Sequence, residues 1–252
     1  MKLRASFINY FILFTIIALS WVGAILLTQS DSASIQLLGW TYLGAKTINL
    51  ITTLLSATKS THIALRIFIG RYLLDSHPLH GLSQALTRYS LEIIQTFVGY
   101  NYCQLHNLFS GIDRVEFCDG ATFTIRQNLS YSMGMMISCF GSIWIGDNVG
   151  KSFTTRVVND PLFMHEYGHS FDSQLWAFLY LPVIGLCSFL SANRIINRAS
   201  RHQDYWTEIR ANRWAKHHFG NHYQVDWDAP SLARSNAPIE YYFPTQSVSQ
   251  IT

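Results

Sequence analysis

The residues of this chain best suited to chemistry are His165, Glu166 and His169, in the run His165-Glu166-Tyr167-Gly168-His169. On a helix, positions i and i+4 lie on one face about one turn apart, so both imidazoles can reach one metal ion. Glu166 is placed to contact a water held at that ion and to accept its proton. The run therefore predicts a zinc-dependent hydrolase. The alternative is an ordinary surface helix with two solvated histidines.

The residues around this run favour a helix. Asp160 offers an N-cap side chain, and Pro161 is well tolerated at the first helical position. Gly168 is a poor helix former, by about 1 kcal/mol relative to alanine. We therefore expect a neighbouring strand or a substrate to approach closely at Gly168.

A third metal ligand is expected on a second helix. A catalytic zinc ion usually takes three protein ligands and leaves a fourth position to water. The chain has Asp172 and Leu175 where a metzincin has glycine and histidine, which excludes that class. Within residues 205–215, Glu208 and Asn212 share one helical face and offer a carboxylate for the metal and an amide to orient a ligand.

The second helix has further expected features. Ala211 and Ala215 permit close packing, and Gly220 is typical of a helix end. Because Glu208 is flanked by Arg210 and Arg213, the alternative for Glu208 is a solvated salt bridge.

These motifs resemble the gluzincin zinc metallopeptidases, particularly the membrane-embedded group in which HExxH is followed by ExxxD. The resemblance implies that His165, His169 and Glu208 bind zinc and that Glu166 is the general base. Asn212 stands where that family has an aspartate and would raise the basicity of a ligand histidine less. The stretch 162–174 and the run 207–215 also resemble a group of uncharacterised bacterial proteins.

Other polar residues are candidates for supporting roles. Asp172 lies three residues after His169 and is expected to orient that histidine. His202 and Tyr205 could donate hydrogen bonds to an oxyanion or be ordinary polar surface. Further histidines are expected to be solvated: His77, His80, His217, His218 and His222.

Composition points to a membrane. Of 252 residues, 49% are hydrophobic and 13% charged, about half the usual charged fraction of ~25%. The net charge of +3 without a long basic run argues against a nucleic-acid partner. The four cysteines show no CxxC spacing, so no second metal site is expected, although Cys118 and Cys139 could pair in an oxidising compartment.

The amino-terminal region contains the expected anchor. Residues 7–27 carry no charge and are long enough to cross a bilayer of about 30 Å. An uncleaved anchor is favoured over a signal peptide cleaved near Ser32–Ser34. Residues 35–55 are also apolar but contain Lys46, and a central charge costs about 3 kcal/mol on insertion scales.

The second stretch decides the topology. If residues 35–55 span, the basic residues that follow place the catalytic part in the cytoplasm, and if they lie flat it faces outward. The expected location is a membrane, the bacterial inner membrane, with the side of the catalytic part left open. Residues 175–190 contain Pro182 and Gly185 and are too short for an easy crossing, which favours a kinked, buried or interfacial hairpin.

The middle of the chain predicts a small sheet. Residues 82–98 have helical spacing that ends near Gly99. Residues 115–118 and 121–125 flank Asp119-Gly120, a turn that closes hairpins. Residues 142–145 indicate a further strand, whose edge could hold an extended peptide or simply support the next helix.

The sequence thus predicts an α+β fold, with one or two membrane helices in residues 1–57, a zincin-like catalytic domain in residues 58–228 and an irregular tail in residues 229–252. The predicted activity is zinc-dependent hydrolysis of a peptide or protein substrate. The alternative is a non-catalytic membrane scaffold or interaction protein with a structural zinc ion or no metal.

Overall fold

The computed structural model describes residues 2–109, 111–125, 133–134, 143–144, 158, 161–196, 202–225 and 227. The chain forms two compact units, Met1–Asp147 and Asn148–Thr252. Three expectations fall outside the described residues: the N-cap at Asp160, the pairing partner Cys139 and the tail at 229–252.

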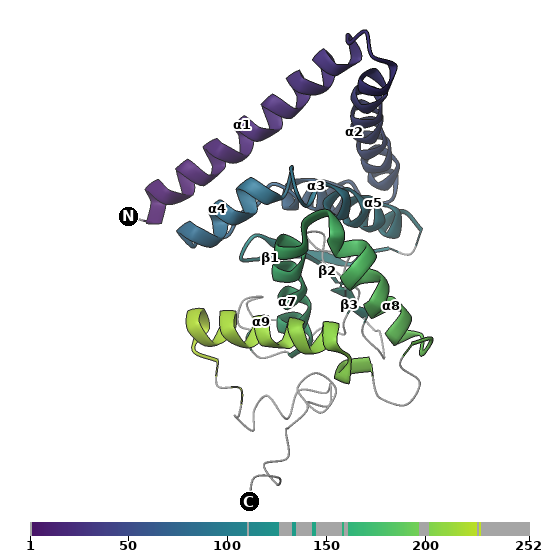
Figure 1. Ribbon diagram of the computed structural model, residues 1–252. Coiled ribbons are helices and arrows are strands. Elements are labelled where there is room, and N and C mark those ends of the chain that lie inside the picture. Colours follow the sequence, from purple (N-terminus) through teal and green to yellow (C-terminus); the bar gives the residue numbers. More distant parts are fainter. Residues whose placement is uncertain are drawn as a thin grey trace, which may run out of the picture. The chain divides into compact units, whose positions relative to one another are not determined.

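The described part is mostly helical (Figure 1), and it contains small antiparallel sheets, of which one was expected. The first unit contains α1 (Lys2–Thr28), α2 (Ala33–Lys59), α3 (Thr61–Gly70), α4 (Pro78–Thr87), α5 (Ile93–Phe109), β1 (Arg114–Cys118), β2 (Ala121–Ile125), β3 (Met133–Gly134) and β4 (Ile143–Trp144). The second contains α7 (Pro161–Trp176), a 3₁₀ turn (Ala177–Leu179), a π-helical segment (Tyr180–Gly185), α8 (Leu186–Ala192), a second 3₁₀ turn (His202–Asp204) and α9 (Trp206–Tyr223).

Helices α1 and α2 pack together and expose apolar side chains. A Cβ atom at Gly39 of α2 would lie 2.7 Å from the Ala24 carbonyl oxygen of α1, so the two backbones touch there. Large apolar side chains on α1 that face outward include Phe7, Phe11 and Leu26. Within the described chain, Phe7–Thr28 is one of two stretches long and apolar enough to cross a membrane, and α2 is not one of them.

The second such stretch, Phe163–Ala192, is bent. Its first helix, α7, ends at Trp176, and the next residue, Ala177, has φ 52°, in the left-handed region that side chains with a Cβ disfavour. Figure 1 shows α7 and α8 running in different directions. The kink expected from Pro182 and Gly185 therefore lies earlier, at Ala177, and the stretch is not one straight helix.

Strands β1 and β2 form the expected hairpin about Asp119 and Gly120. These residues have φ of 47° and 77°, as a two-residue turn with positive φ at both central positions requires. The register pairs Cys118 with Ala121 at the turn.

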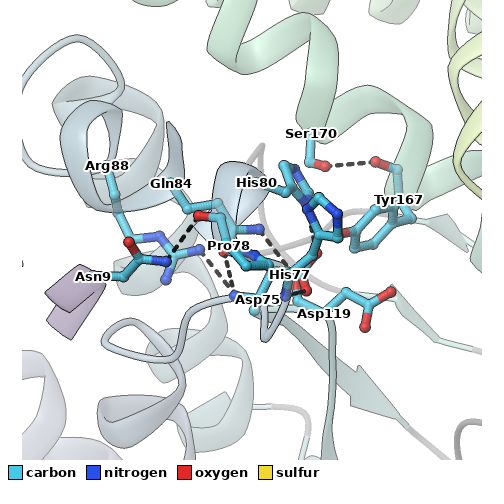
Figure 2. A network of polar contacts seen from close by, with 11 residues as sticks. Asn9, Asp75, His77, Pro78, His80, Gln84, Arg88, Asp119, Tyr167 and Ser170 are labelled. Carbon is cyan, nitrogen blue, oxygen red and sulfur yellow. Dashed lines mark hydrogen bonds and ion pairs between the residues drawn. The ribbon is translucent and has the colours of Figure 1, made fainter. Parts of the chain in front are cut away.

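Polar contacts tie this turn to the segment before α4 (Figure 2). The Gln84 side chain accepts the Asp75 backbone N–H at 2.7 Å and donates to the Asp119 carbonyl at 2.9 Å. His80 Nδ1 lies 2.6 Å from Asp75 Oδ2, and the His80 side chain is only 11% exposed. The expectation that His80 is solvated is therefore wrong, because the carboxylate of Asp75, in the segment before α4, contacts the His80 ring.

The helix expected over residues 82–98 is instead two helices, α4 and α5, and α5 continues through Gly99 to Phe109. The break between them contains the buried Tyr89, whose hydroxyl donates to a backbone carbonyl at 3.2 Å. Glycine at position 99 destabilises a helix by only about 1 kcal/mol relative to alanine. Burial of the adjacent Tyr100 side chain stabilises α5 by more than that, so the helix continues.

Candidate metal centre

The site forms where one face of α7 meets one face of α9, two helices that cross in Figure 1. Both faces follow the spacing i, i+3, i+4, i+7 of a packed helix stripe, and all of their residues are buried. The α7 stripe is His165, Gly168, His169 and Asp172. The α9 stripe is Glu208, Ala211, Asn212 and Ala215.

Gly168 allows the two stripes to meet. A Cβ atom at Gly168 would lie 2.0 Å from the Ala211 carbonyl oxygen, closer than any side chain could tolerate. Ala211 and Ala215 are both fully buried, as expected for close packing. The close approach predicted from Gly168 is confirmed, but the neighbour is helix α9 and not a strand or a substrate.

Three side chains with metal-binding atoms converge there. Glu208 Oε2 lies 3.2 Å from His165 Nε2 and 3.4 Å from His169 Nε2. One ligand atom from each of the three residues lies within 4.8 Å of the other two. Ligand atoms bound to one tetrahedral zinc ion at about 2.0–2.1 Å are separated by about 3.3 Å, so these separations fit such an ion. Two imidazoles and a carboxylate are also a common donor set of catalytic zinc ions.

Hydrogen bonds orient two of these three side chains. His165 Nδ1 lies 2.7 Å from Asn212 Oδ1, which accepts the ring N–H and leaves Nε2 free to bind a metal. The Thr207 hydroxyl donates to Glu208 Oε1 at 2.8 Å, which leaves Oε2 for the imidazoles. The sequence carries no signal for Thr207, because consecutive helix residues point in different directions.

Comparisons with protein families, with curated proteins and with solved structures found no match to this chain.

The charge state of Glu208 suits a metal ligand. Burial raises the pKa of this carboxyl, but the imidazoles of His169 and His165 outweigh burial and hold the pKa well below its usual range. Glu208 is thus ionised at neutral pH. It is also 3% exposed, so the alternative of a solvated salt bridge with Arg210 is wrong.

Arg210 pairs with Asp172 instead. Asp172 Oδ1 accepts from Arg210 Nη2 at 2.7 Å and from Trp214 Nε1 at 3.0 Å, which joins α7 to α9. Among the described residues, neither Asp172 Oδ2 nor His169 Nδ1 has a hydrogen-bond partner. The orienting hydrogen bond expected from Asp172 to His169 is therefore not formed.

His202 lies at the edge of the cluster. Its Nε2 is 3.6 Å from Glu208 Oε2, its Nδ1 is 3.2 Å from Ser191 Oγ, and its side chain is 34% exposed. Burial lowers the pKa of His202, with a smaller opposing effect from Glu208, so the ring is neutral at neutral pH. The other oxyanion candidate, Tyr205, caps α9 and accepts the Glu208 N–H through its backbone carbonyl at 3.0 Å. Within the described residues, the Tyr205 hydroxyl makes no hydrogen bond to the cluster.

Glu166 lies beside His165 on α7 and is 8% exposed. Tyr167, the next residue, is fully buried and stacks on His218 of α9 with ring centroids 4.8 Å apart. The expectation that His218 is solvated is therefore wrong. The expected helix end at Gly220 is also wrong, because α9 runs to Tyr223 and packs against Tyr167 along this second half.

Proposed function

We propose that this chain is a membrane-associated zinc-dependent hydrolase of the gluzincin type, with a zincin-like catalytic domain that acts on peptide bonds. The observation that carries the proposal is the convergence of buried metal-binding atoms from His165, His169 and Glu208 within 4.8 Å. Burial of a carboxylate is unfavourable unless a partner compensates it. A divalent cation would compensate Glu208 and use both imidazoles at once.

Each side chain then has a role. Bound zinc would supply Lewis acidity and lower the pKa of a water toward about 7. Glu166 accepts a proton from the attacking water and passes it to the leaving amine. His202 is placed to donate a hydrogen bond to the developing oxyanion. Asn212 keeps the His165 ring oriented through the hydrogen bond at 2.7 Å.

The membrane assignment is supported by α1. Phe7–Thr28 has the length and composition of a crossing helix, and its large side chains are exposed, including Phe7 at 72% and Phe11 at 65%. Apolar surface of this extent is unfavourable in water and is suited to lipid. We place the protein in the bacterial inner membrane, with lipid and a peptide or protein substrate as its partners.

Metal analysis tests this function directly. The purified chain, reconstituted with zinc, is expected to bind one ion. Glu208→Gln is expected to lower zinc affinity by at least about 100-fold, since even loss of groups outside the ligand set costs about 10- to 100-fold. Asp113→Asn, at an exposed position of the first unit, is the matched control and should leave zinc affinity unchanged. A wild-type chain that takes up no zinc would contradict the proposal.

A second candidate function is a structural zinc site, and the position of His202 favours it. Its Nε2 lies 3.6 Å from Glu208 Oε2 but outside the group of ligand atoms that lie within 4.8 Å of one another, so a shift of the His202 side chain would make it a fourth protein ligand and leave no position for water. In that case the chain would be a zinc-stabilised membrane scaffold.

His202→Ala separates the two functions. If His202 stabilises an oxyanion, we expect zinc affinity to be nearly unchanged and the hydrolytic rate to fall about 10²- to 10³-fold. If His202 is a fourth ligand, zinc affinity should fall together with stability. His217→Ala, at an exposed position on α9, is the control. Zinc affinity by competition with a chelator and peptide hydrolysis are the two measurements.

A further inference from the structure

A second candidate site lies in the first unit and shares no residue with the metal centre. A small cavity of about 50 Å³ is lined by residues of α2, α5 and the segments that follow α3 and α4. Its lining includes two cationic side chains, Lys46 of α2 and Arg71 after α3, among three tyrosines: Tyr42, Tyr89 and Tyr100.

Within the described part of the chain, neither cation has an acidic partner. Among the described residues, no carboxylate lies within ion-pair distance of Lys46 or Arg71. Arg71 is 8% exposed; its Nη2 donates to the Tyr72 hydroxyl at 2.6 Å, while its buried Nε has no hydrogen-bond partner. Burial and the charge of Arg71 lower the pKa of Lys46 to about 8. Two partly buried like charges without a counter-ion are unfavourable.

Aromatic rings compensate these charges only in part. Lys46 Nζ lies 4.8 Å from the Tyr42 ring centroid and 5.2 Å from that of Tyr89, and the Arg71 guanidinium lies 4.7 Å from that of Tyr100. Such cation–π contacts contribute about 0.5–2 kcal/mol each. Ring faces do not replace the strong acceptors that ammonium and guanidinium groups bind in water. The cavity thus holds two charged donors, and its described lining includes no anionic acceptor.

We propose that this cavity binds the phosphate group of a ligand between Arg71 and Lys46. Arg71 offers a planar set of donors that matches phosphate oxygens, and Lys46 adds a point charge. Two cations suit the high charge of phosphate better than the single charge of a carboxylate. The ring centroid of Trp21, on the apolar helix α1, lies 6.0 Å from Lys46 Nζ. Since α1 is suited to lipid, the phosphate could belong to the head group of an anionic phospholipid or be free phosphate, and the test must distinguish these two sources.

The test uses the full chain in uncharged detergent micelles. Thermal unfolding and calorimetric binding are measured with inorganic phosphate, short-chain phosphatidylglycerol and phosphatidylcholine of the same chain length. We expect phosphatidylglycerol or inorganic phosphate to raise Tm, and phosphatidylcholine not to. A rise with inorganic phosphate identifies free phosphate as sufficient, whereas a rise with phosphatidylglycerol alone identifies the lipid.

Lys46→Gln is the decisive variant, because the contacts of Lys46 in the cavity are with ring faces. We expect it to weaken anion binding at least tenfold, while Tm without ligand changes little, because the loss of the cation–π contacts is offset by the removal of an unpaired charge. Lys59→Gln, at the exposed end of the same helix, should bind as wild type does. The proposal is overturned if neither anion binds wild type, if phosphatidylcholine stabilises it equally, or if both variants bind alike.

Discussion

Replacement of Glu166 by glutamine is expected to leave zinc bound and to slow peptide hydrolysis about 10²- to 10⁴-fold, the usual contribution of a general base. Glutamine has the shape of glutamate but cannot accept the proton of the attacking water. The three proposed ligands, His165, His169 and Glu208, are untouched. Zinc content by mass spectrometry and cleavage of a mixed peptide library check the two halves of the expectation.

Glu116→Gln, on the hairpin of the first unit, is the control for loss of a glutamate charge and should hydrolyse peptides as wild type does. Undiminished turnover in Glu166→Gln would show that another group removes the proton. Loss of zinc together with activity would show that Glu166 supports the metal site and not the chemistry.

Gly168→Ala is expected to destabilise the second unit strongly, because there is no room for the added methyl group. The new Cβ would lie 2.0 Å from the Ala211 carbonyl oxygen, so the α9 backbone must move. Overpacking of this kind destabilises by about 3 kcal/mol, more than the roughly 1 kcal/mol that alanine gains over glycine in a helix. Because Glu208 and Asn212 lie on the displaced stripe, zinc affinity should fall as well.

Gly185→Ala supplies the matched control. Its nearest heavy atom would be Leu181 Cδ2 at 3.5 Å, an ordinary contact, so stability should be equal to or slightly above wild type. Urea unfolding in detergent and chelator competition measure both effects. Equal stability and equal zinc affinity in the two variants would mean that α7 and α9 do not pack as described.

Features that depend only on neighbouring residues could be predicted from the sequence. The spacing of His165 and His169 places both imidazoles on one helical face whatever surrounds the helix. Asp119-Gly120 specifies a hairpin because few other residue pairs tolerate positive φ at both positions. The uncharged run on α1 specifies a long apolar helix. Gly168 also indicated a close contact, because glycine destabilises a helix and is expected there only where a neighbour leaves no room for a side chain.

The partners that these residues contact could not be predicted from the sequence, because they come from distant segments of the chain. Glu208 could have faced solvent beside Arg210, but Asp172 binds that arginine and Glu208 turns toward the imidazoles. His218 is buried where a solvated ring was expected, because Tyr167 stacks on it. Spacing along a helix sets which of its residues share a face. The helix that packs against the metal-binding face of α7 is α9, some forty residues further along the chain. Packing between distant segments, and not local propensity, therefore selects the contacts that define the site.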